Sequence, residues 1–124
     1  MPGPLSPRGA PRTRSRRERF DRTVVGVVSA LQAAWPRDLA DVEFGVEDVP
    51  WVDDDWWPAQ IPLSALVSRT SRRPARIVVY RLPIQAQARR HGGGSERELV
   101  YAVLVERVCE LLDRPIVEVD PRSG

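Results

Sequence analysis

The chain has few of the side chains that most often bind transition metals. Its 124 residues include one cysteine, Cys109, and one histidine, His91. A single cysteine excludes an internal disulfide and a cysteine-rich zinc knuckle. With one imidazole and one thiol, the usual nitrogen and sulfur ligand sets for zinc cannot be assembled. We therefore expect no resident metal and no other cofactor.

Long apolar runs are also missing from the sequence. No stretch approaches the ~20 apolar residues that a membrane span needs, and the N-terminus lacks the apolar segment of a signal peptide. The apolar fraction of 42% and the charged fraction of 29% are typical of a globular domain. The length fits one domain with a modest core. These features predict a cytoplasmic protein without a membrane partner.

Lysine is absent, so arginine carries all the positive charge, and the charge is unevenly distributed. Residues 1–22 have a net charge of +5, whereas residues 23–124 have a net charge of −3. Residues 1–14 are rich in proline, glycine and arginine without apolar periodicity, which predicts a disordered leader. Such an arm can bind nucleic acid. No aromatic residues lie between the arginines, however, so we expect no nucleic-acid partner and rank this function last.

The rest of the chain predicts one α+β domain over residues 15–121, followed by a tail at 122–124. Apolar residues recur every three or four positions over residues 15–35, which indicates an amphipathic helix. Gly26 inside this helix costs up to ~1 kcal/mol relative to alanine, and so suggests close packing there. Residues 41–49 alternate between apolar and polar side chains, which is typical of a half-buried strand.

A loop region, a second strand and a short helix are expected next. Two prolines argue against regular structure over residues 51–73. Residues 76–81 are rich in β-branched side chains and predict a strand. Pro83 then suits the first turn of a short helix that continues over residues 84–90.

The loop region contains an acidic run between tryptophans. Asp53, Asp54 and Asp55 could suggest a hard-cation site, because such cations take oxygen ligands. The run lacks the glycine turn and the distal glutamate of a calcium loop, so we interpret it as a solvated turn. Tryptophan is enriched at binding hot spots. A secondary hypothesis is therefore that the tryptophans form a surface for a protein or peptide partner: Trp51, Trp56 and Trp57.

The last predicted helix, Ser95 to Leu112, is apolar around most of its circumference. Ser95 and Glu98 stand in the positions of a capping box. Glu106 and Glu110 are four residues apart, which places both carboxylates on one helical face. Glu110 and Arg114 have the same spacing and are expected to form an ion pair. A short extended segment is predicted after the helix.

Three segments resemble the minimal zincin-like metallopeptidase family found in actinobacteria and other bacteria. They are V-E-F-G-V-E-D-V-P at 42–50, R-I-V-V-Y-R-L-P-I at 76–84, and E-L-V-Y-A-V-L-V-E-R-V-C-E-L-L-D at 98–113. With the first helix, the resemblance covers residues 15–121. It implies an N-terminal helix, a small sheet of short strands and a long C-terminal motif helix. Active members carry His-Glu-x-x-His on that helix, where the histidines bind zinc and the glutamate is the general base.

The motif is degenerate in this chain, where it reads Glu106-Arg107-Val108-Cys109-Glu110. By the resemblance, Glu106 and Glu110 stand at the histidine positions, Arg107 at the position of the base and Asp113 at a glycine. Arginine cannot act as a base, because it stays protonated in proteins. Two carboxylates without imidazole are poor zinc ligands. We therefore expect a pseudoenzyme without peptidase activity, which keeps a structural or protein-binding role.

Two other functions remain as alternatives. The first is a hydrolase with a divalent metal held by carboxylates, using Glu106 and Glu110 with help from Asp113 or Glu118. The second is weak nucleic-acid binding through the arginine-rich N-terminus.

Overall fold

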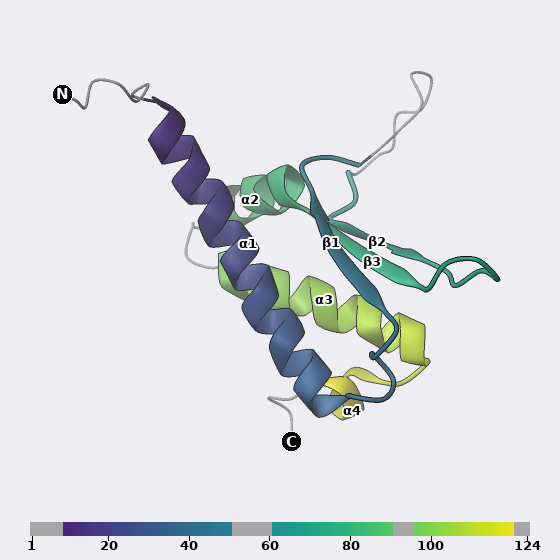
Figure 1. Cartoon of the computed structure of the whole chain (residues 1–124). Coiled ribbons are helices and arrows are strands. Elements are labelled where there is room, and N and C mark those ends of the chain that lie inside the picture. Colours follow the sequence, from purple (N-terminus) through teal and green to yellow (C-terminus); the bar gives the residue numbers. More distant parts are fainter. Residues whose placement is uncertain (1–8, 51–60, 91–95, 121–124) are drawn as a thin grey trace.

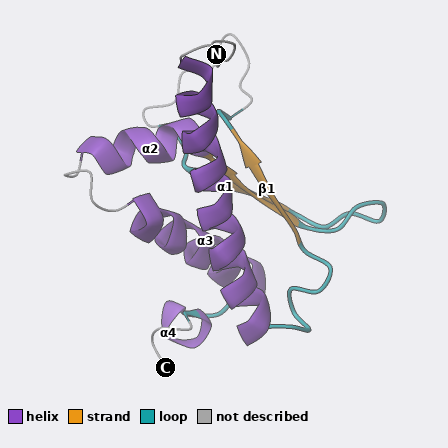
Figure 2. Cartoon of the chain, turned by 60° about the vertical axis from the view of Figure 1, so that its left-hand side comes forward, coloured by secondary structure: helices purple, strands orange, loops and turns teal. Residues whose placement is uncertain are grey.

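Helices gather on one side of a small mixed sheet in a computed structural model of the chain (Figures 1 and 2). The structure describes residues 9–50, 61–90 and 96–120, with side chains from residue 15 onward. The elements follow in the order α1 (Gly9–Ala34), β1 (Glu43–Glu47), β2 (Ser64–Val67), β3 (Arg76–Tyr80), α2 (Arg81–Arg90), α3 (Glu96–Leu112) and α4 (Ile116–Val119). The predicted α+β class is confirmed. No helix in the described ranges has the length and apolar character to cross a membrane.

The sheet has the strand order β1-β3-β2, with β3 in the centre. β1 runs parallel to β3, with Phe44 opposite Ile77, and β2 runs antiparallel to β3, with Ala65 opposite Val78. The two predicted strands are confirmed, although β3 ends at Tyr80 because α2 begins at once. The prediction of a loop over residues 51–73 is wrong for β2. This strand is only four residues long and is stabilised by pairing with a distant segment, which no local pattern indicates.

The first helix starts earlier than predicted. α1 begins at Gly9 rather than at Ser15, so the prediction of disorder is wrong for residues 9–14. Pro11 is compatible with this start, because in the first turn its missing N–H has no intrahelical acceptor to lose. Residues 1–8 lie outside the described part. With 26 residues, α1 is also longer than α3, which has 17.

The core forms where α1 and the sheet pack on α3. The predicted apolar stripe of α1 is buried, and α3 is buried on several sides, including Val103 on the arc next to the glutamates. Strand β3 contributes Ile77 and Val79 between these layers. The buried helix residues are Phe20, Val24, Val27 and Leu31 of α1, and Val100, Val103, Leu104, Val105 and Val108 of α3.

The chain turns sharply after α3. Asp113 has a left-handed backbone conformation with φ of 54°, and the Arg114 N–H donates to the Cys109 carbonyl oxygen at 3.1 Å. A bond of this kind across a left-handed residue is the Schellman ending of a helix. The predicted extended segment is instead the short helix α4, whose Val119 is buried. Trp35 anchors it, because its Nε1–H donates to the Val119 carbonyl oxygen at 3.3 Å.

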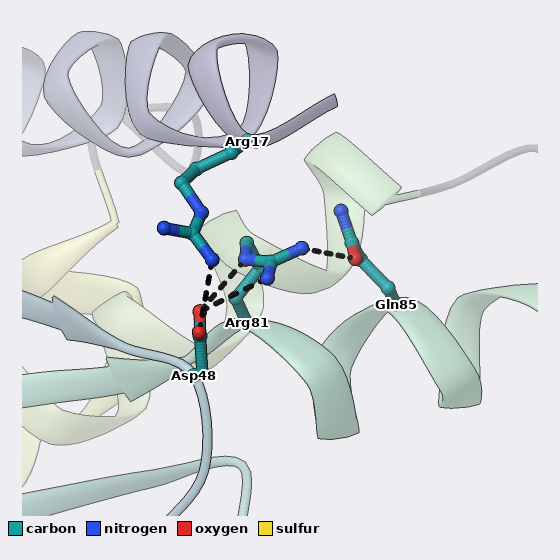
Figure 3. A network of polar contacts seen from close by, with 4 residues as sticks. All are labelled: Arg17, Asp48, Arg81 and Gln85. Atoms are coloured by element: carbon teal, nitrogen blue, oxygen red, sulfur yellow. Dashed lines mark hydrogen bonds and ion pairs between the residues drawn. The ribbon is translucent and has the colours of Figure 1, made fainter. Parts of the chain in front are cut away.

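A carboxylate joins α1, the end of β1 and the start of α2 (Figure 3). Arg81 is buried at 7% exposure, and its Nε and Nη2 each lie 3.0 Å from Asp48 Oδ1. Arg17 donates from Nη2 to Asp48 Oδ2, also at 3.0 Å. Arg81 Nη1 donates to Gln85 Oε1 at 3.2 Å. Burial of a guanidinium is costly unless it is paired, so Asp48 permits Arg81 to start α2 inside the protein. We call the contacts of Asp48 with Arg17 and Arg81 the joint at Asp48.

Gly26 gives a direct test of helix energetics. The prediction of close packing at Gly26 is wrong, because a Cβ placed there meets no atom within 4 Å. Since the position is exposed and helical, Gly26→Ala should raise the free energy of unfolding by up to ~1 kcal/mol. Urea denaturation monitored by circular dichroism measures this change. A loss of stability would contradict the open surroundings of Gly26.

The joint at Asp48 predicts two effects of different size. Asp48→Asn leaves the buried Arg81 guanidinium without a counter-charge and should lower the free energy of unfolding by about 1–3 kcal/mol. Arg17→Gln removes only an ion pair between side chains that are 54% and 45% exposed, and should cost less than ~1 kcal/mol. Both variants are compared by urea denaturation. Equal effects of the two substitutions would show that Arg81 does not depend on Asp48.

Candidate functional site

The two glutamates of the degenerate motif lie on the exposed strip of α3, while Arg107 between them in the sequence is half-buried. The side chains of Glu106 and Glu110 are 66% and 54% exposed, and that of Arg107 is 23% exposed. Arg107 Nη2 lies 2.9 Å from Glu106 Oε1, and Nη1 lies 2.9 Å from Glu110 Oε1. The two carboxylates therefore face the same side of the helix, as their spacing predicts, but they share one guanidinium between them.

This arrangement does not fit a metal centre. Arginine remains charged at all physiological pH values, so Arg107 places a fixed positive charge between the only two carboxylates of the motif. A cation there would meet this charge and compete with it for both carboxylates. Asp113 lies beyond the end of α3, in the turn. Within the described ranges, no group of three or more histidine, cysteine, aspartate or glutamate side chains is placed to hold a metal ion.

The predicted ion pair between Glu110 and Arg114 does not form. Arg114 lies after the left-handed Asp113, so it leaves the helical face that the i,i+4 rule assumes. Its guanidinium instead lies 3.2 Å from Glu118 and 5.3 Å from the centre of the Trp35 ring. Glu110 takes Arg107 as its partner, so the ion pairs of Glu110 and Arg114 are separate.

Cys109 does not have the properties of a catalytic nucleophile. The thiol is half-buried, and burial raises its pKa above the ordinary value. The negative charges of Glu106 and Asp120 raise this pKa further, against a smaller lowering by a backbone hydrogen bond. The net effect disfavours the thiolate, which is the reactive form of cysteine. Burial, together with Glu106 and Asp120, therefore makes Cys109 a poor nucleophile.

A groove of about 730 Å³ separates α1 from β1. Its volume is within the range of ligand pockets. Val24, Val25 and Val28 line one wall, Phe44 and Val46 line the other, and the joint of Arg17, Asp48 and Arg81 lies among the lining residues. The sequence does not predict this groove, because neither α1 nor β1 alone indicates that a space will remain between them. The only feature of the sequence that pointed to this groove was the apolar face of β1.

The outer edge of β1 borders the groove. The Glu43 N–H donates to the Ala75 carbonyl oxygen, which directs the backbone of Glu43 towards β3. Since backbone groups alternate along a strand, the N–H and C=O of Phe44 and Val46 point to the other side. Within the described residues, no strand pairs with that side. The groove therefore combines apolar side chains with an unpaired strand edge.

Several predicted site residues lie outside the described part of the chain. These are the proposed partner surface of Trp51, Trp56 and Trp57, the acidic run at residues 53–55, and His91. The hypothesis that the tryptophans bind a partner stays a prediction.

Comparison with known proteins assigns this chain to no family. No protein-family model matches this chain, and no curated protein matches it.

Proposed function

We propose that this protein is a non-catalytic relative of the minimal zincin-like metallopeptidases that binds an extended segment of another protein. The observation that carries the proposal is the double ion pair of Arg107. Where the resemblance expects a general base between two zinc ligands, this chain has a permanent cation that holds both carboxylates at 2.9 Å. That charge competes with a zinc ion for both carboxylates, and arginine cannot take a proton from water.

The end of α3 supports the resemblance itself. The family has a glycine where this chain has Asp113, and the backbone there has φ of 54°. This left-handed region is the one that favours glycine, while aspartate is among the few other residues that tolerate it. The backbone turn that a glycine would serve is therefore present in this chain with a different side chain.

The groove between α1 and β1 supports the binding role. An extended peptide can add to the free edge of β1 through backbone hydrogen bonds and place alternate side chains against Phe44 and Val46. Glu43 and Glu47 are exposed on this strand, and Glu47 lies 3.4 Å from Arg76. A basic residue of the partner is therefore favoured opposite Glu43. A second copy of the chain fits less well, because antiparallel pairing centred on Gly45 would place Glu43 opposite Glu47 of that copy.

The loss of metal chemistry is tested on protein purified without chelators. We expect far less than one zinc per chain by elemental analysis, and no cleavage of a peptide pool with added zinc, manganese or magnesium. One equivalent of metal, or cleavage that is lost in Glu106→Ala, would overturn the proposal in favour of a carboxylate-bound metal. Glu18→Ala, an exposed acid on α1 outside the motif, is the matched control.

The binding role is tested with peptides selected against the wild-type protein from a displayed random library. Val25 is 63% exposed and lines the groove, whereas Val67 is 51% exposed on β2, at the opposite edge of the sheet. Val25→Asp should weaken the selected peptides by about tenfold or more, and Val67→Asp should leave their affinity unchanged. The groove is not the binding surface if both variants weaken the peptides equally, or if no peptide is enriched.

A further inference from the structure

We propose that α1 and α2 together form a site for the phosphate backbone of nucleic acid. Between the two helices lies a hollow of about 270 Å³ lined by Arg16 and Arg19 of α1 and by Gln85 and Arg89 of α2. The three arginines are exposed, and no ion pair within the described residues uses them. Guanidinium groups that converge without an ion-pair partner attract an anion, and their planar fork matches the oxygens of a phosphate.

The periodicity of α1 separates these arginines from the structural one. Phe20 and Val24 belong to the buried stripe of the helix. Arg17 lies on one flank of this stripe, where it is held by Asp48. Arg16 and Arg19, three residues apart, lie on the other flank beside α2. Neighbouring arginines in the sequence thus have different surroundings, and only one of these three is neutralised.

Gln85 adds a hydrogen-bond donor to the hollow. Arg81 Nη1 lies 3.2 Å from the Gln85 amide. Since arginine can only donate, the amide must present its oxygen to Arg81. Figure 3 shows the amide nitrogen of Gln85 turned away from Arg81. The buried arginine therefore fixes Gln85 with a donor available to an anion in the hollow.

The lining favours nucleic acid over an anionic membrane. A helix that binds a membrane surface inserts apolar side chains beside its basic ones. Over residues 15–23 of α1 the only apolar side chain is Phe20, which is fully buried. The hollow also has no aromatic residue for base stacking. Contacts would therefore be made to phosphates, with little preference for base sequence.

One acidic residue opposes the anion. Glu96, at the start of α3, lines the same hollow. Its negative charge should lower the affinity for phosphate, since it lies among the arginines. Glu96→Gln should therefore strengthen binding, which a binding mode elsewhere on the protein does not predict.

The test measures fluorescence anisotropy of a labelled single-stranded oligothymidylate with the full chain at low salt. The triple variant Arg16→Gln/Arg19→Gln/Arg89→Gln should weaken binding by about tenfold or more and reduce the slope of log K against log salt by about 2. The control is Arg69→Gln/Arg72→Gln/Arg73→Gln, which changes the net charge equally. Its arginines are exposed in the connection between β2 and β3, which extends away from the helices (Figures 1 and 2).

The outcomes distinguish binding in the hollow from attraction to the overall positive charge of the protein. Retained affinity in the control and a gain in Glu96→Gln would support the hollow. Equal losses in both triple variants, or no binding by the wild type, would overturn it. Tighter binding to vesicles rich in phosphatidylserine than to the oligonucleotide would assign the surface to membranes instead. Thermal melts of each variant confirm that the substituted positions, all exposed apart from half-buried Glu96, leave the fold intact.

Discussion

The need to cover α3 on several sides determines the arrangement of the other elements. Its buried residues, from Val100 to Val108, occupy most of the helical circumference. Such a helix is stabilised in water only when other elements remove this surface from solvent. α1, α2, α4 and the sheet do so, and each buries its own apolar side in the process. The order of elements in the chain is less important to stability than this enclosure.

The elements that cover α3 leave one strip of the helix exposed to solvent, and Glu106 and Glu110 lie on it. Ion pairs to exposed carboxylates contribute less than ~1 kcal/mol each, and Glu106 and Glu110 are both exposed, so their contacts with the half-buried Arg107 are a weak source of stability. Their consequence is chemical. A cation lies between the two carboxylates, and burial, with the negative charges of Glu106 and Asp120, raises the pKa of the Cys109 thiol. The motif therefore disfavours a general base, a nucleophilic thiolate and a bound metal ion.

The sequence predicts the elements whose signal is periodic and local. The stripe of α1, the alternation of β1 and the β-branched run of β3 each report the environment of their own residues, and all three are present. The sequence did not predict the joint at Asp48, because Arg81 follows the β-branched run and was assigned to the end of that strand. In the structure Arg81 is the first residue of α2. The ion pair expected from Glu110 failed for a related reason, since the left-handed backbone at Asp113 ends the helical spacing. The groove and the basic hollow depend on distances between elements, which no single segment encodes.

The two surfaces proposed for binding both include charged residues of α1. Asp48 provides one negative charge for two guanidinium groups, those of Arg17 and Arg81. The joint therefore satisfies the buried arginine, and its three side chains keep a net charge of +1, while Asp21 adds a negative charge on the side of the groove. Gln85 connects the two, because it accepts from Arg81 and also lines the hollow. Asp48 lowers the positive potential without cancelling it, so the contact that stabilises the start of α2 still permits anion attraction at Arg16 and Arg19.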